Sequence, residues 1–280
     1  MPRLRRREDS KHSKIWMIRL MRRKKKEAER MPMAMAKHYA HRGFHDKPLV
    51  PENSMAAFRR AVAHGFGSEF DVHLIADGSL VIFHDEQLER QTGVKGEIED
   101  YDITNLKKLR LEGTDEQIPT FDEVLDLYED TGLPLVIELK SSRGNYRKLA
   151  EAACRRLDSY SGDFVLESFD PRVMAAVRKI RPDFIRGQLV QNFFVTRDGL
   201  PMWQAALLTF LKTNTLVKPD FIAFRFRDRD TRALGFSLRK SFRREGAAKV
   251  TWTITTPEDY REAVRSGMVP IFEQFDPDEI

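Results

Sequence analysis

Cysteine is nearly absent from this 280-residue chain, and no long uninterrupted run of hydrophobic residues occurs in it. The single cysteine, Cys154, excludes an internal disulfide framework, and we interpret it as a small core residue in a helical stretch. A chain without disulfides is typical of a reducing compartment, so we expect a cytoplasmic location. Because no segment approaches the ~20 apolar residues that cross a bilayer, we expect no transmembrane helix.

Glycine and proline are also sparse, with 15 and 13 residues, and no Gly/Ser-rich linker divides the chain. Hydrophobic residues make up 41% and charged residues 32%, which is typical of a globular protein and excludes disorder over most of the chain. The length suffices for one large domain or two small ones. Because no linker or internal repeat interrupts residues 37–280, we interpret them as one domain.

The excess of positive charge is confined to a basic N-terminal tail, residues 1–36. The tail holds thirteen Lys/Arg against four Asp/Glu, a net charge of +9, whereas the whole chain carries +5. Residues 37–280 therefore carry −4, so the body of the protein has no electrostatic footprint for nucleic acid.

The only apolar patch of the tail, Ile15 to Met21, is short and is interrupted by Arg19, which makes it a poor signal peptide. One interpretation is a membrane-surface anchor, with Trp16 at the headgroups and basic side chains on anionic lipid, which would make this a peripheral membrane protein. The other is a solvated, disordered tail, which we favour.

Strand-like and helix-like segments alternate from residue 37 onward, the pattern of a parallel α/β fold. Helix start signals are clear, as at Asp170-Pro171 and Thr256-Pro257. Nine runs are strand-like, and the Asp77-Gly78 turn marks one of them as a hairpin partner, which leaves about eight for an α/β barrel. The predicted strands are 37–41, 69–75, 80–84, 135–140, 164–169, 185–190, 221–226, 249–254 and 269–272.

Acidic residues recur at alternate positions of strands that are otherwise apolar. Side chains two residues apart on a strand share a face, so Glu69 pairs with Asp71 and Glu138 with Lys140. In a parallel barrel these faces lead to the strand C-termini, where active sites are built. Three carboxylates on neighbouring strands suit a hard divalent cation, Mg²⁺ or Ca²⁺, which would bind phosphoryl oxygen.

Two histidines and two basic residues accompany these carboxylates. His41 and His84, at strand ends, would supply an acid and a base near neutral pH. Arg42 and Lys140 would contact an anion, Arg as a fork and Lys as a point charge. A lone strand histidine is more often structural, and Glu-x-Asp is common on surfaces, so the specificity lies in the ordered combination.

The combination resembles the glycerophosphodiester phosphodiesterase family, relatives of phosphatidylinositol-specific phospholipase C. The similarity covers residue 37 to the C-terminus. It rests on His41-Arg42-Gly43, Pro51-Glu52-Asn53-Ser54, Glu69-x-Asp71, Asp77-Gly78 through His84-Asp85, and Glu138-x-Lys140, with weaker support from Ser168-Phe169-Asp170, Pro219-Asp220-Phe221-Ile222 and Thr251-Trp252-Thr253.

The resemblance implies a TIM (β/α)8 barrel that hydrolyses glycerophosphodiesters, in glycerol and lipid metabolism. It implies one divalent cation, Mg²⁺ or Ca²⁺, bound by Glu69, Asp71 and Glu138. His41 is then the general base and His84 the general acid. In the route that the resemblance implies, the glycerol 2-hydroxyl attacks phosphorus and expels the alcohol, and the cyclic phosphate is hydrolysed to glycerol 3-phosphate. The resemblance also implies that Arg42 and Lys140 bind phosphate oxygens. It implies that Glu52 either binds the metal or orients a group near it.

Several residues keep two interpretations. His73, in phase with Asp71, lines the pocket or is structural. Trp252 packs on glycerol or fills the barrel. Glu273 departs from the Ile-Thr-Asp/Asn strand end that many members of the family have, and reaches the pocket or only closes the barrel. We interpret His45 as a surface residue, and Met202 to Leu211 as an apolar helix that packs on the core rather than forming a lid.

Two other functions remain open. A lysophospholipase D-like or sphingomyelinase D-like phosphodiesterase would share the fold, but the Glu138-x-Lys140 pair favours glycerophosphodiesters, small molecules, as substrates. A non-catalytic, membrane-docked binding barrel is disfavoured because the histidine pair and the three carboxylates are intact. The sequence does not indicate the head group of the substrate.

Overall fold

The computed structural model describes residues 36–196, 200–230, 232–233, 236–237 and 248–280. Apart from Ala36, the predicted basic tail therefore lies outside the described residues. No helix in the described ranges is both long enough and apolar enough to traverse a lipid bilayer.

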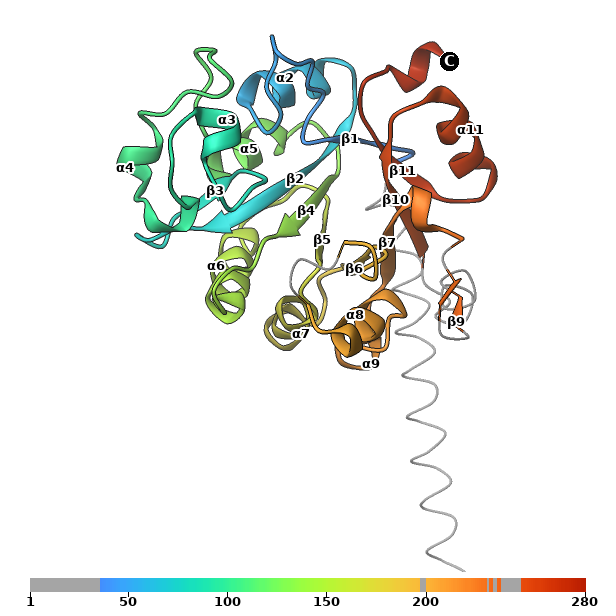
Figure 1. Cartoon of the computed structure of the whole chain (residues 1–280). Helices are drawn as coiled ribbons and strands as arrows, with labels where there is room; N and C mark the ends of the chain where they lie inside the picture. Colours follow the sequence, from blue (N-terminus) through green and yellow to red (C-terminus); the bar gives the residue numbers. More distant parts are fainter. Residues whose placement is uncertain (1–35, 197–199, 231, 234–235, 238–247) are drawn as a thin grey trace, which may run out of the picture.

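Eight parallel strands close into a barrel, which confirms the predicted TIM fold (Figure 1). Strand β1 pairs with both β2 and β11, so the sheet has no open edge between them. The strands follow one another around the barrel as β1 (Tyr39–His41), β2 (Gly67–Leu74), β4 (Leu135–Leu139), β5 (Phe164–Ser168), β6 (Arg186–Val190), β7 (Phe221–Arg225), β10 (Ala248–Ile254) and β11 (Val269–Phe272).

Two hairpins supplement the barrel. Strand β3 (Leu80–Ile82) pairs antiparallel with β2, as the Asp77-Gly78 turn predicts. It ends two residues before the predicted boundary, so His84 lies in the loop beyond the strand. The hairpin of β8 (Arg232–Ala233) and β9 (Phe236–Ser237) was not predicted.

Helices surround the strands (Figure 1), and side-chain caps fix where α2, α5, α7 and α11 begin. The hydroxyl or carboxyl oxygens of Ser54, Thr120, Asp170 and Thr256 accept backbone N–H groups of the first turn, as expected for these residues. The α-helices of the described residues are α2 (Met55–Ala63), α3 (Glu89–Thr92), α4 (Ile103–Leu106), α5 (Phe121–Tyr128), α6 (Tyr146–Leu157), α7 (Pro171–Ile180), α8 (Met202–Thr209), α9 (Asn214–Val217) and α11 (Pro257–Arg265). The same ranges contain the 3₁₀ helices η1 (Ile98–Asp100), η2 (Phe226–Asp228) and η3 (Pro277–Glu279).

The core-packing prediction for helix α8 is only partly correct. Ala205 and Thr209 are buried, but Met202 and Trp203 are 54% and 63% exposed. Apolar residues occupy several sides of this short helix, and one barrel wall can cover only one of them.

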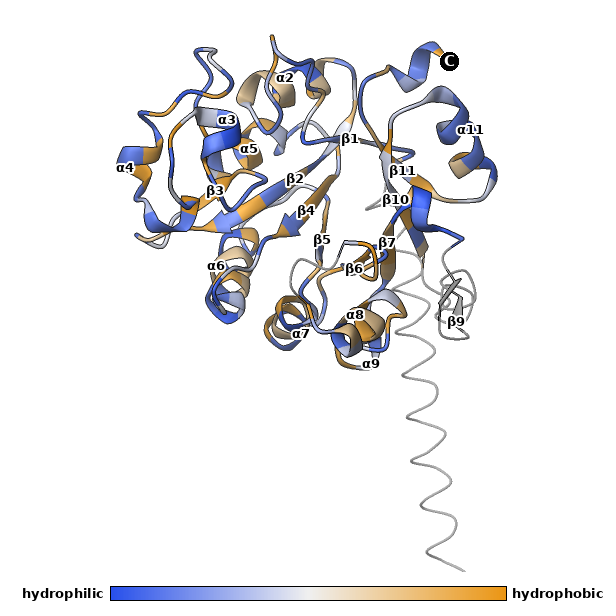
Figure 2. Ribbon diagram, viewed as in Figure 1, coloured by the Kyte–Doolittle hydropathy of each residue, from blue (hydrophilic) through white to orange (hydrophobic). Residues whose placement is uncertain are grey.

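The barrel interior changes from apolar to charged along the strands, and this change positions the site. Val136 and Val165 lie in an apolar layer with residues of the other strands. Two residues further along, on the same face, come Glu138 and Glu167, and in register with Glu138 across the sheet is Asp71. The blue segments on otherwise pale or orange strands in Figure 2 mark such polar positions.

Candidate active site

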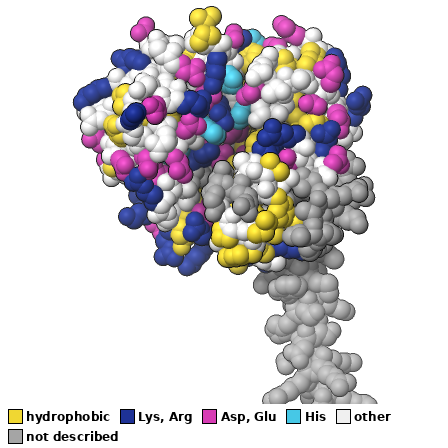
Figure 3. Space-filling view, in the orientation of Figure 1, with side chains coloured by type: hydrophobic (Ala, Val, Ile, Leu, Met, Phe, Trp, Pro, Cys, Tyr) yellow, Lys and Arg dark blue, Asp and Glu magenta, His cyan; other side chains and the backbone are white. Residues whose placement is uncertain are grey.

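A cavity of about 230 Å³ is lined by residues of the barrel strands and of the loops that follow β1, β3, β5 and β6. Figure 3 shows histidine, acidic and basic side chains gathered at a hollow in the face of the molecule. Ionic groups line one part of the cavity and mainly apolar groups the other. The lining residues are His41, Arg42, Glu69, Asp71, His84, Glu138, Glu167, Phe169, Leu189, Gln191, Trp252 and Ile271.

The three predicted metal ligands converge. One carboxylate oxygen from each of Glu69, Asp71 and Glu138 lies within 4.8 Å of the other two, and the residues are only 3%, 0% and 7% exposed. Burial, reinforced by Asp71 and Glu138, raises the pKa of Glu69 well above its usual range. Burial likewise raises the pKa of Glu138 to about 7 although Lys140 opposes it. An all-oxygen set with surplus negative charge fits a hard divalent cation.

Asp71 is held in place by donors on three different segments. Asn53 Nδ2 donates to its Oδ2 at 2.9 Å, Arg42 Nε lies 3.6 Å from the same oxygen, and Lys140 Nζ lies 3.3 Å from Oδ1. Burial alone would raise the pKa of Asp71, but Lys140, His84 and Arg42 outweigh it and keep the carboxylate ionised. Its Oδ1 faces the Lys140 ammonium in this ion pair, so a bound cation would share the oxygen with Lys140.

The loop after β1 explains the His41-Arg42-Gly43 motif. Arg42 and Gly43 both have positive φ, 54° and 76°, a conformation that glycine adopts without strain. A Cβ atom on Gly43 would also lie only 2.9 Å from the backbone of Ala57, so a side chain does not fit there. The turn directs the Arg42 backbone N–H to Glu69 Oε2 at 3.3 Å.

Lys140, which follows β4, approaches the carboxylates with its Nζ 3.3 Å from Glu138 Oε1. The side chains of Arg42 and Lys140 therefore both border the carboxylate cluster.

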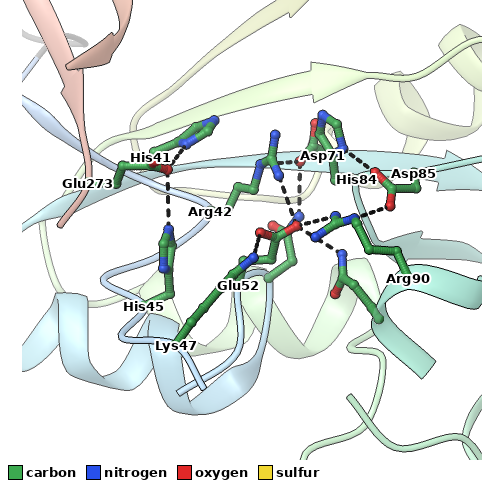
Figure 4. Close-up of polar contacts among 12 residues, drawn as sticks. His41, Arg42, His45, Lys47, Glu52, Asp71, His84, Asp85, Arg90 and Glu273 are labelled. Atoms are coloured by element: carbon green, nitrogen blue, oxygen red, sulfur yellow. Dashed lines mark hydrogen bonds and ion pairs between the residues drawn. The ribbon is translucent and has the colours of Figure 1, made fainter. Parts of the chain in front are cut away.

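His41 is oriented by Glu273, the residue that follows the last strand of the barrel. Its Nδ1 lies 2.7 Å from Oε2 of Glu273 (Figure 4). Its Nε2 lies 3.9 Å from Oε2 of Glu69. When Nδ1–H donates to Glu273, Nε2 carries the lone pair and faces the carboxylate cluster. Burial and Arg42 lower the pKa of His41 to about 4 against the effect of Glu273, so the imidazole is neutral at neutral pH and competent as a base.

The surface interpretation of His45 is wrong. This residue is 8% exposed, and its Nε2 lies 3.4 Å from the same Glu273 oxygen that binds His41. Glu273 therefore reaches the site and carries two histidines (Figure 4). Burial would raise the pKa of Glu273, but His41 and His45 outweigh it and lower this pKa below the usual range.

His84 lies on the other side of the carboxylates, in the loop after β3. Its Nδ1 is 2.6 Å from Oδ1 of Asp85, which in turn accepts from Arg90. Nε2 is thus the nitrogen left for a ligand. Burial lowers the pKa of His84, while Asp71 and Asp85 oppose this shift. A bound anion would oppose it further and favour the protonated, acidic form.

Comparison with known proteins identifies the family to which the chain belongs. The profile of the Glycerophosphoryl diester phosphodiesterase family matches residues 41–275. The chain belongs to this family. A glycerophosphodiester phosphodiesterase from Caldanaerobacter subterraneus subsp. tengcongensis is 29% identical over 242 residues, 82% of this chain and 90% of the relative.

Two further similarities differ in extent. An Oleispira antarctica phosphodiesterase, solved with the product sn-glycerol-3-phosphate, has the same fold with a TM-score of 0.69. It is 23% identical, and the match covers 85% of this chain and 93% of that one. A human lysophospholipase D is 35% identical, but over only 119 residues, 38% of this chain and 37% of the relative.

Glu52, from the Pro-Glu-Asn motif of the glycerophosphoryl diester phosphodiesterase resemblance, lies beside the carboxylate cluster rather than in it. It accepts from Arg42 Nη1 at 2.8 Å and also from Lys47, Arg90 and Gln91. Burial would raise the pKa of Glu52, but Arg42, Arg90 and Lys47 outweigh it and lower the value to about 2. The structure thus places Glu52 where it orients Arg42 (Figure 4).

Of the two remaining candidates, Trp252 lines the cavity and His73 does not. His73 is fully buried with Nδ1 3.4 Å from Glu99, and it is not among the residues that line the cavity. Trp252 does line the cavity, with its ring edge-to-face against Phe169 at 5.6 Å.

Among the lining residues that the sequence analysis did not predict, one is acidic, Glu167 of β5. It is 1% exposed and lies in register with Glu138. Burial, with Glu138 and Asp71, raises its pKa well above the usual range. A signal existed, because Glu167 interrupts the apolar run of residues 164–166 in phase with Val165.

Proposed function

We propose that this chain hydrolyses glycerophosphodiesters to glycerol 3-phosphate and an alcohol with the aid of one divalent cation, Mg²⁺ or Ca²⁺. The observation that carries the proposal is the buried set of Glu69, Asp71 and Glu138, flanked by His41 and His84. Family membership and the relative from Caldanaerobacter support the same reaction.

The phosphodiester would be held by charges of opposite sign. A cation on the three carboxylates would polarise a phosphoryl oxygen and offset its negative charge. Arg42 and Lys140 border the same carboxylates at 3.3–3.6 Å from Asp71, and can reach further phosphate oxygens. Glu52 keeps the Arg42 guanidinium in this position through its 2.8 Å hydrogen bond.

The two histidines would move the protons. His41 Nε2 accepts the proton of the glycerol 2-hydroxyl as this oxygen attacks phosphorus, and Glu273 stabilises the resulting imidazolium. His84 Nε2 donates a proton to the leaving alcohol, with Asp85 holding its Nδ1. In the second step the roles reverse, since His84 can take a proton from water and His41 can return one to the 2-hydroxyl.

An activity panel with the 2-deoxy analogue of glycerophosphocholine tests this function. The panel contains glycerophosphocholine, glycerophosphoethanolamine, glycerophosphoinositol and a lysophospholipid, each with Mg²⁺, Ca²⁺ and chelator. We expect turnover of the three glycerophosphodiesters, loss with chelator, and scarcely any turnover of the 2-deoxy analogue, because the internal nucleophile supplies a large share of the rate. Turnover of the analogue at the rate of its parent would show direct attack by water.

A lysophospholipase D activity is the second candidate. The human relative of that name matches 119 residues, and Phe169, Leu189 and Trp252 form an apolar side of the cavity. The lysophospholipid in the panel distinguishes it, since a lysophospholipase D would turn over this substrate faster than glycerophosphocholine.

We further propose a cytoplasmic location. For the basic tail of residues 1–36 we favour a solvated segment, and peripheral contact with anionic membrane is the alternative, which the net charge of +9 and Trp16 would support.

A further inference from the structure

Glu167 is a buried acid to which the mechanism above gives no role. It is 1% exposed, it lines the cavity, and its Oε2 has no hydrogen-bond partner in the ranges that the structure describes. A polar group left unpaired in the interior is unfavourable by roughly 1–3 kcal/mol or more. Such a group in a ligand cavity indicates a partner that arrives with the ligand.

The metal centre does not supply that partner. The carboxylate oxygens that approach one another within 4.8 Å belong to Glu69, Asp71 and Glu138, and Glu167 is not part of this group among the described residues. Its strand, β5, is one position further around the barrel than the strand of Glu138. Glu167 therefore faces the cavity beyond the cation site.

On the side away from Glu138, the surroundings of Glu167 are apolar. The next strand contributes Gly187, in register with Glu167, and the ring of Phe221 occupies the space that a side chain on Gly187 would fill. Leu189 and Trp252 continue this side of the cavity. Glu167 thus lies at the border between the carboxylates of the cation site and an apolar wall, where one polar group of a small ligand can be recognised.

We propose that Glu167 determines specificity for glycerol, by accepting a hydrogen bond from the terminal hydroxyl of the glycerol moiety. The inference rests on the proposed function. The 2-hydroxyl must lie beside His41, and the alcohol that varies among substrates must leave toward solvent. The glycerol end therefore points inward, and its terminal hydroxyl needs an acceptor at the buried, apolar side. Glu167 Oε2 is the unpaired acceptor there.

The test uses an analogue of glycerophosphocholine in which propane-1,2-diol replaces glycerol. This analogue keeps the 2-hydroxyl nucleophile and lacks only the terminal hydroxyl. Since the analogue leaves the buried carboxyl group of Glu167 unpaired, wild-type kcat/KM should fall by on the order of 10- to 100-fold. Glu167→Leu should lose activity on glycerophosphocholine and distinguish the two substrates by less than about 3-fold. Glu167→Gln, whose amide oxygen still accepts, should restore part of the discrimination.

Two results would overturn this role of Glu167. Equal losses on both substrates in Glu167→Leu would assign Glu167 to the metal centre or to the fold, and would overturn the inference. So would a wild-type enzyme that hydrolyses both substrates equally well, a result that needs no variant to fold. Glu151→Leu, an exposed glutamate of α6, is the matched control and should keep the wild-type discrimination. If the wild type fails to turn over glycerophosphocholine with either metal, the proposed function is refuted, and the inference with it.

Discussion

Glu273→Gln tests the contact that orients the proposed base. In the wild type, Glu273 Oε2 lies 2.7 Å from Nδ1 of His41 and holds the lone pair of Nε2 toward the cluster. A glutamine at this position has the same size, but its amide can donate to Nδ1. Such a bond would favour the tautomer with hydrogen on Nε2, which cannot accept the proton of the glycerol hydroxyl.

The expected loss follows from this contact. A charge-assisted hydrogen bond contributes about 1.5–3 kcal/mol, which sets a lower bound of roughly 10- to 100-fold on the loss of kcat/KM. Where a carboxylate holds a catalytic histidine in its tautomer, replacement by the amide lowers kcat by up to about 10⁴-fold, as in serine proteases. We therefore expect Glu273→Gln to lose between ~10² and ~10⁴ in kcat/KM on glycerophosphocholine. Glu273→Ala should lose less, because it removes the acceptor without donating to Nδ1.

The pH profile separates positioning from structural damage. The base must be neutral, so activity rises with pH through the pKa of His41, about 4, where burial and Arg42 have lowered it. The charge of Glu273 favours the imidazolium and opposes this shift. In Glu273→Gln this charge is gone, so the pKa of His41 must fall further. The rise of kcat/KM with pH should therefore occur at lower pH than in the wild type, and the maximal kcat/KM should be smaller.

Asp278→Asn is the control for this experiment. Asp278 is on the same C-terminal segment and forms an exposed pair with Lys37 at 3.9 Å, so kcat/KM of Asp278→Asn should stay within about 2-fold of the wild type. Wild-type activity in Glu273→Gln, or a reduced plateau with the acidic limb in its original place, would refute the reasoning.

The remaining predictions concern the cation, the acid and the tail. Asp71→Asn should keep the fold by circular dichroism yet weaken cation binding in calorimetry and abolish turnover; normal turnover at limiting metal would contradict the ligand assignment. His41→Ala and His84→Ala should each lose at least ~10²–10⁴-fold, and bis(p-nitrophenyl) phosphate, whose leaving group needs little protonation, should partly rescue His84→Ala alone. Equal rescue of both would reverse or remove the assignment of base and acid. Removing residues 1–36 should leave turnover of soluble substrate unchanged. If the tail is solvated, as we favour, the full-length protein should ignore anionic vesicles at low salt, whereas salt-sensitive vesicle binding that is lost with residues 1–36 would establish the membrane-contacting alternative.

Strand periodicity predicted the part of the site that depends on local sequence. Glu69 and Asp71 share a face because they are two residues apart, and Glu138 joins them because parallel strands in register point matching residues inward. The barrel itself follows from the alternation of strand and helix signals. These features depend on pattern alone, and for that reason a single sequence contains them.

The residues that were missed or misinterpreted depend on how the barrel closes. Glu273 is 232 residues from His41, and their contact requires β11 to pair with β1. The same closure buries His45, which in sequence looks like a loop residue. Glu52 belongs to the matched motif, but its partners Lys47 and Arg90 come from the loop after β1 and from helix α3, so the sequence could not distinguish a metal ligand from a residue that orients Arg42. Ion-pair partners of this kind are set by tertiary packing, which leaves no periodic signal.

The charges around the cluster explain why a divalent cation is the suitable one. Three carboxylates, Glu69, Asp71 and Glu138, face two cations, Arg42 and Lys140, which gives the protein groups a formal charge of −1. A divalent cation changes this to +1, and a phosphodiester monoanion then brings the site to zero, the least unfavourable charge for a buried site. The phosphomonoester product carries nearly two negative charges at neutral pH, so its formation returns the site to about −1. The same imbalance that draws in a cation and substrate would therefore favour release of the product.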